Sequence, residues 1–265
     1  MPDPTLNRYK ALVRKIFLDR HKKAATVVPF ERADLERAAS TLKIDLPKNL
    51  GDVIYSIRYR TPMPEEVLAT QPKGKQWIIE GTGRSQYAFK LVPINRIAPN
   101  ASLVQIKIPD ATPEIIATYA LSDEQALLAK VRYNRLVDIF LGISVYSLQN
   151  HLRTTVKSIG QIEIDEIYVG VDRHGQQYVI PVQAKAGADQ ISVVQTRQDI
   201  LCCQAKFPDL MCRSISAQFM ADETIALFEF TLVDDQVKVV EERHYRLVPA
   251  DQISPEDLKS YSRRA

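Results

Sequence analysis

Residues 162–187 read IEIDEIYVGVDRHGQQYVIPVQAKAG and form the most informative stretch of this chain. Residues 162–171 and 178–182 are rich in β-branched and aromatic side chains, which favour strands. Between them lies the polar segment 172–176, whose glycine and aspartate are typical of a turn. The stretch therefore predicts a β-hairpin.

The position of the turn sets the register of this hairpin. With His174 at the centre, Asp165 faces Gln183 and Glu163 faces Lys185. Side chains alternate along a strand, so each strand presents its two residues on one face, with opposed Cβ atoms about 5 Å apart. The other face of the second strand is an apolar row that a helix can cover, namely Ile180, Val182 and Ala184.

Asp165, Gln183 and Lys185 together are the groups needed to hold a divalent cation and activate a water beside a phosphate. The alternative is a solvated hairpin on which Glu163 and Lys185 form an ordinary cross-strand ion pair and Gln183 is exposed. Apolar residues on both faces of the strands favour the first interpretation, because a charge in a covered strand needs a partner or a function.

This hairpin resembles the PD-(D/E)XK nuclease superfamily, the fold of many type II restriction endonucleases. The motif residues are Asp165, Gln183 and Lys185, and Glu163 or Glu166 can supplement the acid. Gln183 departs from the family pattern, which has Glu or Asp there, and a neutral oxygen is a weaker ligand for a hard cation. The resemblance covers roughly the second half of the chain.

The resemblance implies an α/β core with a mixed central sheet flanked by helices. It implies Mg²⁺ held by Asp165, Gln183 and the main-chain oxygen of Ala184, with Lys185 orienting or deprotonating the attacking water. The family often places an auxiliary acid on the helix before the hairpin. Here a helix is expected from an N-cap at residue 122 to about residue 150, with an interruption near Gly142 as the alternative. Asp138 is the first candidate and Glu124 the second, although either equally suits a solvated helix residue.

The N-terminal half predicts a DNA-binding module. Helical patterns at residues 4–20, 31–41 and 52–59 precede two strands around the loop 81–85, which is the outline of a winged helix. The candidate DNA contacts are Arg58, Arg60 and Arg84. A dimerisation or scaffold module of the same outline is the alternative.

Charge divides the chain in the same way. Residues 1–120 hold 19 Lys and Arg against 12 Asp and Glu, whereas residues 121–265 hold 16 against 20. A basic front half suggests a polyanionic partner, and an acidic rear half suits a cation-binding domain. We therefore expect a boundary near residue 120, with a DNA-binding domain at 1–120 and a nuclease domain at 121–265.

Composition sets the remaining expectations. Cys202, Cys203 and Cys212 form no CxxC pair or zinc spacing, so reduced thiols in a cytoplasm are expected. No apolar run is long enough to cross a membrane. The function expected from the whole sequence is Mg²⁺-dependent, sequence-specific cleavage of double-stranded DNA by a homodimer. The alternatives are a DNA repair nuclease of the same fold and a non-catalytic winged-helix regulator.

Overall fold

The computed structural model of the chain describes residues 4–59, 61–93, 96–119, 123–156, 159–186 and 189–262. The fold is α/β, with a mixed central sheet flanked by helices. The chain forms two compact units, the first comprising Met1–Arg96 with Thr155–Gln161 and Ser192–Val194. The second comprises Ile97–Thr154, Ile162–Ile191 and Gln195–Ala265.

The expected boundary near residue 120 differs from this division, which falls after Arg96. The reason is β5 (Gln105–Pro109), which pairs with β13 (Gln236–Val248) in parallel. The segment between residues 97 and 120 therefore contributes a strand to the large sheet of the second unit.

The first unit contains three main helices and a three-stranded antiparallel sheet in the order β1-β3-β2. Its elements are α1 (Pro4–Arg20), β1 (Val27–Glu31), α2 (Arg32–Leu42), α3 (Gly51–Tyr59), α4 (Glu65–Leu68), β2 (Gln76–Gly83) and β3 (Gln86–Val92). The predicted helices match α1, α2 and α3, and the predicted ribbon matches β2 and β3, whereas α4 and β1 were not predicted. A capping box between Glu31 and Asp34 begins α2 directly where β1 ends.

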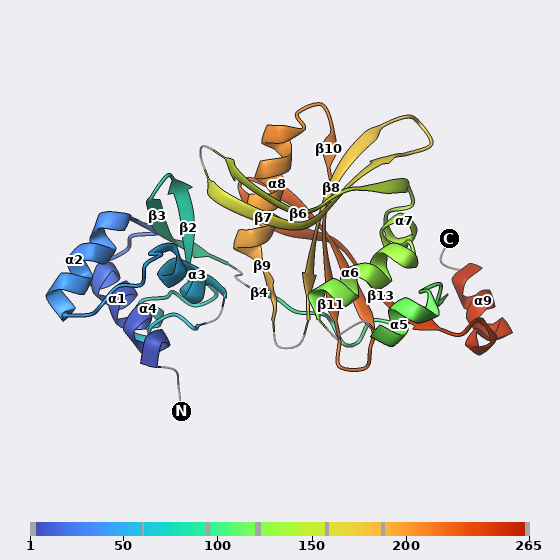
Figure 1. Cartoon of the computed structure of the whole chain (residues 1–265), viewed down its shortest axis with the longest axis horizontal. Coiled ribbons are helices and arrows are strands. Elements are labelled where there is room, and N and C mark those ends of the chain that lie inside the picture. The colour runs from blue at the N-terminus through green and yellow to red at the C-terminus, as the bar shows by residue number, and fades with distance from the viewer. Residues whose placement is uncertain are drawn as a thin grey trace. The chain divides into compact units, whose positions relative to one another are not determined.

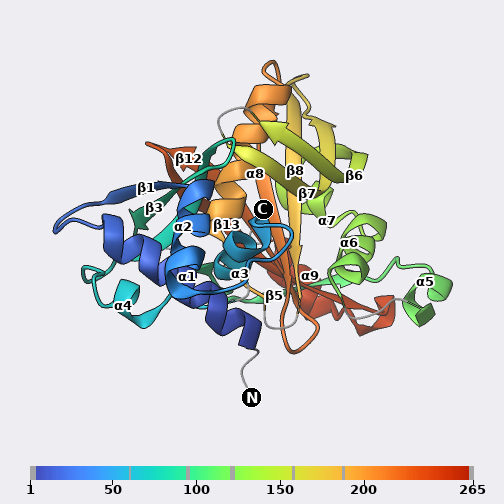
Figure 2. The same ribbon diagram turned by 60° about the vertical axis from the view of Figure 1, so that its left-hand side comes forward.

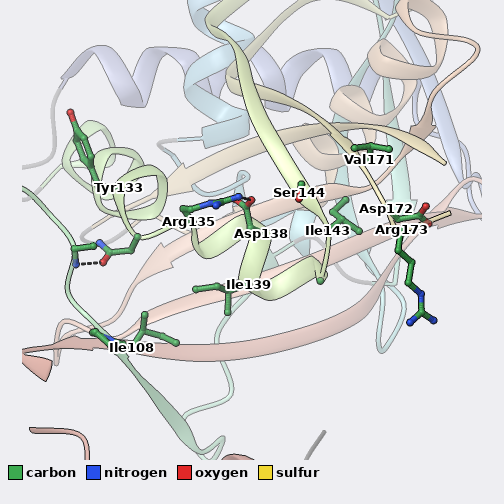
Figure 3. A pocket seen from close by; sticks show the side chains of 14 residues that line it. Ile108, Tyr133, Arg135, Asp138, Ile139, Ile143, Ser144, Val171, Asp172 and Arg173 are labelled. Atoms are coloured by element: carbon green, nitrogen blue, oxygen red, sulfur yellow. Dashed lines mark hydrogen bonds and ion pairs between the residues drawn. The ribbon is translucent and has the colours of Figure 1, made fainter. Parts of the chain in front are cut away.

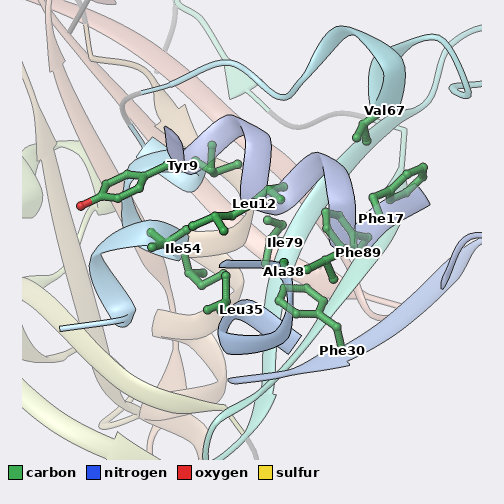
Figure 4. Close-up of a cluster of buried hydrophobic side chains, with 14 of the residues drawn as sticks. Tyr9, Leu12, Phe17, Phe30, Leu35, Ala38, Ile54, Val67, Ile79 and Phe89 are labelled. Carbon is green, nitrogen blue, oxygen red and sulfur yellow. The ribbon is translucent and has the colours of Figure 1, made fainter. Parts of the chain in front are cut away.

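The apolar faces of α1, α2 and α3 pack with the sheet into one core (Figure 4). Leu12 and Phe17 of α1 and Phe89 of β3 are fully buried there. Phe17 meets Phe89 edge to face with ring centroids 5.0 Å apart, a favoured aromatic geometry.

The second unit contains the large sheet, in the order β5-β13-β12-β11-β8-β7-β6, with β10 also pairing with β8. Its elements are β5, α5 (Glu114–Tyr119), α6 (Glu124–Tyr133), α7 (Leu136–Leu141), β6 (Ser144–Val156), β7 (Gly160–Val171), β8 (Gln177–Lys185), α8 (Val193–Lys206), β10 (Met211–Cys212), β11 (Ser214–Phe219), β12 (Ile225–Val233), β13, the 3-10 helix η1 (Ala250–Gln252) and α9 (Pro255–Ser262). A separate two-stranded sheet joins β4 (Arg96–Ile97) and β9 (Ile191–Ser192).

The β7–β8 hairpin has the predicted register, since Glu166 pairs with Val182 and Val171 with Gln177. Its turn is closed by the Asp172 carboxylate, which accepts hydrogen bonds from the main-chain N–H of His174 at 2.8 Å and of Gln176 at 3.0 Å. Gly175 takes a φ of 84° in this turn, a conformation that glycine adopts without strain. After α8 the chain returns through β11, which pairs with β8 in parallel.

Helices cover both faces of this part of the sheet (Figures 1 and 2). α6 and α7 lie against one face, where Leu127, Val131 and Val137 meet the predicted apolar row of β8. α8 lies on the other face (Figure 2). This sandwich explains why β8 is buried along almost its whole length.

The last part of one expected helix is a strand. The helix predicted from residue 122 to about 150 ends at Leu141, where Gly142 takes a left-handed conformation, and β6 begins at Ser144. The N-cap is Asp123, whose carboxylate accepts from the N–H of Ala126 at 2.9 Å, while residue 122 lies outside the described residues. Among the helices that the structure describes, none combines the length and the apolar character required to cross a bilayer.

Candidate functional site

The end of the β7–β8 hairpin brings Asp165 against the main chain of the predicted motif. The pairing of the two strands extends to Glu166 and Val182. One residue further, the Asp165 carboxylate accepts a hydrogen bond from the N–H of Ala184 at 2.9 Å. Ala184 lies between Gln183 and Lys185, so the acid sits at the centre of the Gln-Ala-Lys triplet. The structure thereby brings together Asp165, Gln183, Ala184 and Lys185.

Lys185, the last residue of β8, is paired with Glu124 of α6 rather than with Glu163. Its Nζ lies 3.1 Å from Glu124 Oε1, and its side chain is only 13% exposed. Glu124 stands in the first turn of α6, which packs against β8, and this packing places the carboxylate at the end of the strand. The cross-strand pair of Glu163 with Lys185, the solvated alternative, is wrong.

The other candidate acids are occupied elsewhere. Glu163 is half exposed and forms an ion pair with Arg153 at 2.9 Å. Asp138, the first choice for an auxiliary acid, pairs with Arg135 and accepts from the N–H of Val145 at 3.1 Å, so it secures the entry to β6. Glu124, the second choice, is therefore the helix acid that lies beside the motif.

Glu166 is the neighbour of Asp165 in sequence but points to the opposite face of the sheet. It is fully buried, and its Oε1 accepts from Arg132 Nε at 2.9 Å and from Ser147 Oγ at 2.6 Å. The carboxylate of Glu166 holds the pKa of Arg132 above its usual range through this hydrogen bond. Glu166 is thus part of a buried ion pair and does not supplement the acid at Asp165.

Gln183 is held at both ends of its amide. Its Nε2 donates to the main-chain oxygen of Glu163 at 3.1 Å, and its Oε1 accepts from Nε2 of Gln195 on α8 at 2.7 Å. Gln183 is 3% exposed, so the expectation of a solvated glutamine is also wrong.

Asp199, one turn after Gln195 along α8, is a deeply buried acid with 1% exposure. Within the described part of the chain, neither of its carboxylate oxygens has a hydrogen-bond partner. Burial raises its pKa well above the usual value, and the charge of Asp165 adds to this, whereas the Gln183 amide and Lys185 act in the opposite direction. Sequence reasoning missed Asp199 and Gln195. The available signal was their spacing, which places both on one face of a helix that packs against the sheet.

The electrostatics suit a site that receives positive charge. Burial raises the pKa of Asp165, and Glu124 adds to that effect, while the hydrogen bond from Ala184 and the charges of Lys185 and His151 lower it. A divalent cation would reverse the cost of burying this carboxylate. The donors that fit a hard cation are the carboxylates of Asp165 and Glu124, the Gln183 amide oxygen and the Ala184 main-chain oxygen.

This donor set is poor in charge. Over the residues that the structure describes, no group of three or more His, Cys, Asp or Glu side chains is arranged to hold a metal. A cation here would therefore depend on neutral oxygens for part of its coordination, which agrees with the weak ligand noted at Gln183 in the sequence.

A cavity of about 770 Å³ lies elsewhere in the second unit, beside α7 and the turn of the hairpin (Figure 3). Its lining includes the Arg135–Asp138 pair and the apolar side chains of Ile108, Ile139 and Val171. None of the motif residues lines it. The cavity is therefore separate from the cluster of motif residues at the end of the hairpin.

The three candidate DNA contacts of the first unit differ in their surroundings. Arg58 donates from Nε to the main-chain oxygen of Ile79 at 2.8 Å and lies over the ring of Tyr87, so it secures α3 to the sheet instead of projecting freely. Arg84 is exposed in the turn between β2 and β3. Arg60 lies outside the described residues.

Comparison of the chain with protein-family models, with curated proteins and with solved structures found no match.

Proposed function

We propose that this chain is a Mg²⁺-dependent endonuclease that cleaves double-stranded DNA. The observation that carries the proposal is the contact of Asp165 with the main chain between Gln183 and Lys185, joined by the ion pair of Lys185 with Glu124. An acid, two neutral oxygens and a lysine in one place match the needs of phosphodiester hydrolysis.

The order of elements supports the same proposal. A helix is followed by three strands adjacent in the sheet, then by α8 and by β11, which is parallel to β8. This is the mixed sheet with flanking helices that the resemblance to PD-(D/E)XK nucleases implies. The motif residues stand at the end of its central hairpin.

In the proposed reaction, oxygen atoms of Asp165, Gln183, Ala184 and Glu124 would hold Mg²⁺. That ion would supply charge neutralisation at the scissile phosphate and a water of lowered pKa. Lys185 orients this water and counters the negative charge that develops on the phosphate oxygens. The ion pair with Glu124 keeps the Lys185 ammonium at the end of β8 while the substrate binds.

The first unit is proposed to bind the duplex as a winged helix. Helix, strand, two helices and a ribbon in a sheet of order β1-β3-β2 are the outline of that module, with Arg84 at the tip of its wing. Arg84→Ala is expected to weaken binding to all duplexes alike and to reduce the slope of log affinity against log salt by about 1. Fluorescence anisotropy with a labelled duplex at several salt concentrations measures both. An exposed lysine away from the wing, Lys48, gives the control variant Lys48→Ala.

A plasmid assay tests the proposed activity. Supercoiled DNA is incubated with the full chain in Mg²⁺ or in EDTA, and binding to the same DNA is measured in parallel. Discrete fragments only in Mg²⁺ support sequence-specific cleavage by a homodimer, because two-fold symmetric proteins read palindromic sites. General degradation favours a repair nuclease of the same fold. Binding without cleavage at any divalent cation favours the non-catalytic regulator.

A further inference from the structure

Gln183 stands where the resemblance expects a carboxylate, and the surroundings of its side chain account for the difference. The main-chain oxygen of Glu163 only accepts hydrogen bonds, so the atom of residue 183 that faces it at 3.1 Å has to be a donor. An amide has such a donor and an ionised carboxylate has none. The pocket around residue 183 is therefore shaped for the nitrogen of an amide on one side.

The other side of the pocket comes from α8. Gln195 donates to Oε1 of Gln183 at 2.7 Å, and it fixes the orientation of the amide oxygen. Asp199 lies one turn away, fully buried, and its two oxygens have no hydrogen-bond partner among the described residues. The Gln183 amide interacts with that carboxyl and offsets part of the cost of burying it.

We propose that Gln195 and Asp199 are positioning residues that select an amide at position 183 and hold its oxygen for the cation. This inference deepens the proposed function, because it concerns the same site. Only the part that involves the cation rests on the proposed function. A glutamate at position 183 would set acceptor against acceptor at Glu163 and carboxyl against carboxyl at Asp199. A glutamate at position 183 is therefore expected to destabilise the folded site. Counting charged metal ligands alone would predict the opposite, a stronger cation site.

The first experiment measures thermal unfolding of the full chain in EDTA at constant pH. Gln183→Glu is expected to lower the unfolding midpoint by on the order of 5 °C, because it leaves buried acceptors unpaired. Adding Asp199→Asn removes the second buried carboxyl and places an amide donor beside the new carboxylate, so the double variant is expected to recover most of this loss. The control is Gln177→Glu, the same change at an exposed position of the same strand, which is expected to leave the midpoint unchanged.

Two outcomes of this experiment overturn the inference. One is a Gln183→Glu variant as stable as the parent chain. The other is a double variant that unfolds no later than Gln183→Glu alone. If the single variant yields no folded protein, the double variant decides: a folded double variant supports the selection of an amide, and an unfolded one overturns it.

The second experiment separates positioning from a purely structural role. The Mg²⁺ concentration that gives half of the metal-dependent rise in unfolding midpoint is measured for the parent chain and for Gln195→Leu. The variant is expected to need about 10-fold more Mg²⁺, as residues that orient a metal ligand usually do, with little change of the midpoint in EDTA. An unchanged Mg²⁺ requirement overturns the positioning role of Gln195.

The two experiments also distinguish this inference from the proposed function. Rescue of Gln183→Glu by Asp199→Asn in EDTA requires no cation. If rescue occurs while the parent chain shows no stabilisation by Mg²⁺, the selection of an amide is supported and the metal-dependent nuclease is refuted.

Discussion

Asp165 and Glu166 are adjacent acids of β7 that serve opposite faces of one sheet, and their environments differ. Glu166, towards α6, is fully buried, and its Oε1 accepts from Arg132 and Ser147, whereas its Oε2 has no hydrogen-bond partner among the described residues. Asp165, on the other face, accepts from one main-chain N–H and has a raised pKa. A carboxylate paired with a dedicated arginine contributes to the fold, whereas a desolvated carboxylate without such a partner is available for chemistry.

The largest expected effect comes from the lysine beside Asp165. Lys185→Ala is expected to reduce DNA cleavage by about 10³-fold, because it removes the charge that orients water and stabilises the transition state. Duplex binding, measured by anisotropy, is expected to stay within about two-fold, since most phosphate contacts lie elsewhere. Equal loss of cleavage and binding would instead make Lys185 a substrate-binding residue, and full cleavage would remove it from the site.

The next effect distinguishes the two helix acids. Glu124→Gln is expected to reduce cleavage by about 10²-fold, because the amide no longer pairs with the Lys185 ammonium or offers charge to the cation. The matched variant Asp138→Asn alters an acid that secures the entry to β6 and is expected to cleave normally. Initial cleavage rates of the two variants on the same plasmid decide which acid contributes. A slow Asp138→Asn variant beside a normal Glu124→Gln variant would make Asp138 the auxiliary acid.

On the other face of the sheet the expected effect is on stability. Glu166→Ala removes a buried partner from Arg132 and is expected to lower the free energy of unfolding by roughly 2 kcal/mol, reduced from the cost of a fully buried pair because Arg132 is partly exposed. Urea unfolding measures this loss. Cleavage per folded molecule is expected to be unchanged, and a loss of activity in the folded fraction would contradict the division between the faces.

The smallest effect concerns pH. A raised pKa means that the ionised form of Asp165 destabilises the folded chain, a cost present at alkaline pH and lost as pH falls through the raised pKa. Asp165→Asn in EDTA is therefore expected to unfold a few degrees later than the parent chain at pH 8, with the difference disappearing under acidic conditions. A variant less stable than the parent at pH 8 would show that the hydrogen bond from Ala184 outweighs burial.

The sequence predicted the parts of the site that depend on local geometry. The register of the hairpin followed from its turn and from the alternation of its strands, and these place Asp165 beside Gln183 and Ala184. The apolar row at Ile180 and Val182 correctly indicated a covering helix.

The parts that were missed depend on tertiary placement. Glu124 reaches Lys185 only because the first turn of α6 lies beside the end of β8. The spacing of residues along one helix does not reveal which strand that helix will contact. Asp199 looked like an ordinary polar residue of α8, because burial of an acid is decided by what packs above it. The first part of β6 was predicted as helix because residues 143–150, after the break expected as an alternative at Gly142, contain no glycine or proline.

The parallel pairing of β11 with β8 has a consequence for how the chain folds. Residues of the β7–β8 hairpin are close in sequence and are expected to meet early, whereas β11 joins only after the intervening helix has docked. Asp165 and Lys185 then approach one another before Gln195 and Asp199 arrive. Refolding followed by pulsed hydrogen exchange is expected to protect the amides of the hairpin before those of β11, so the proposed site is completed late in folding.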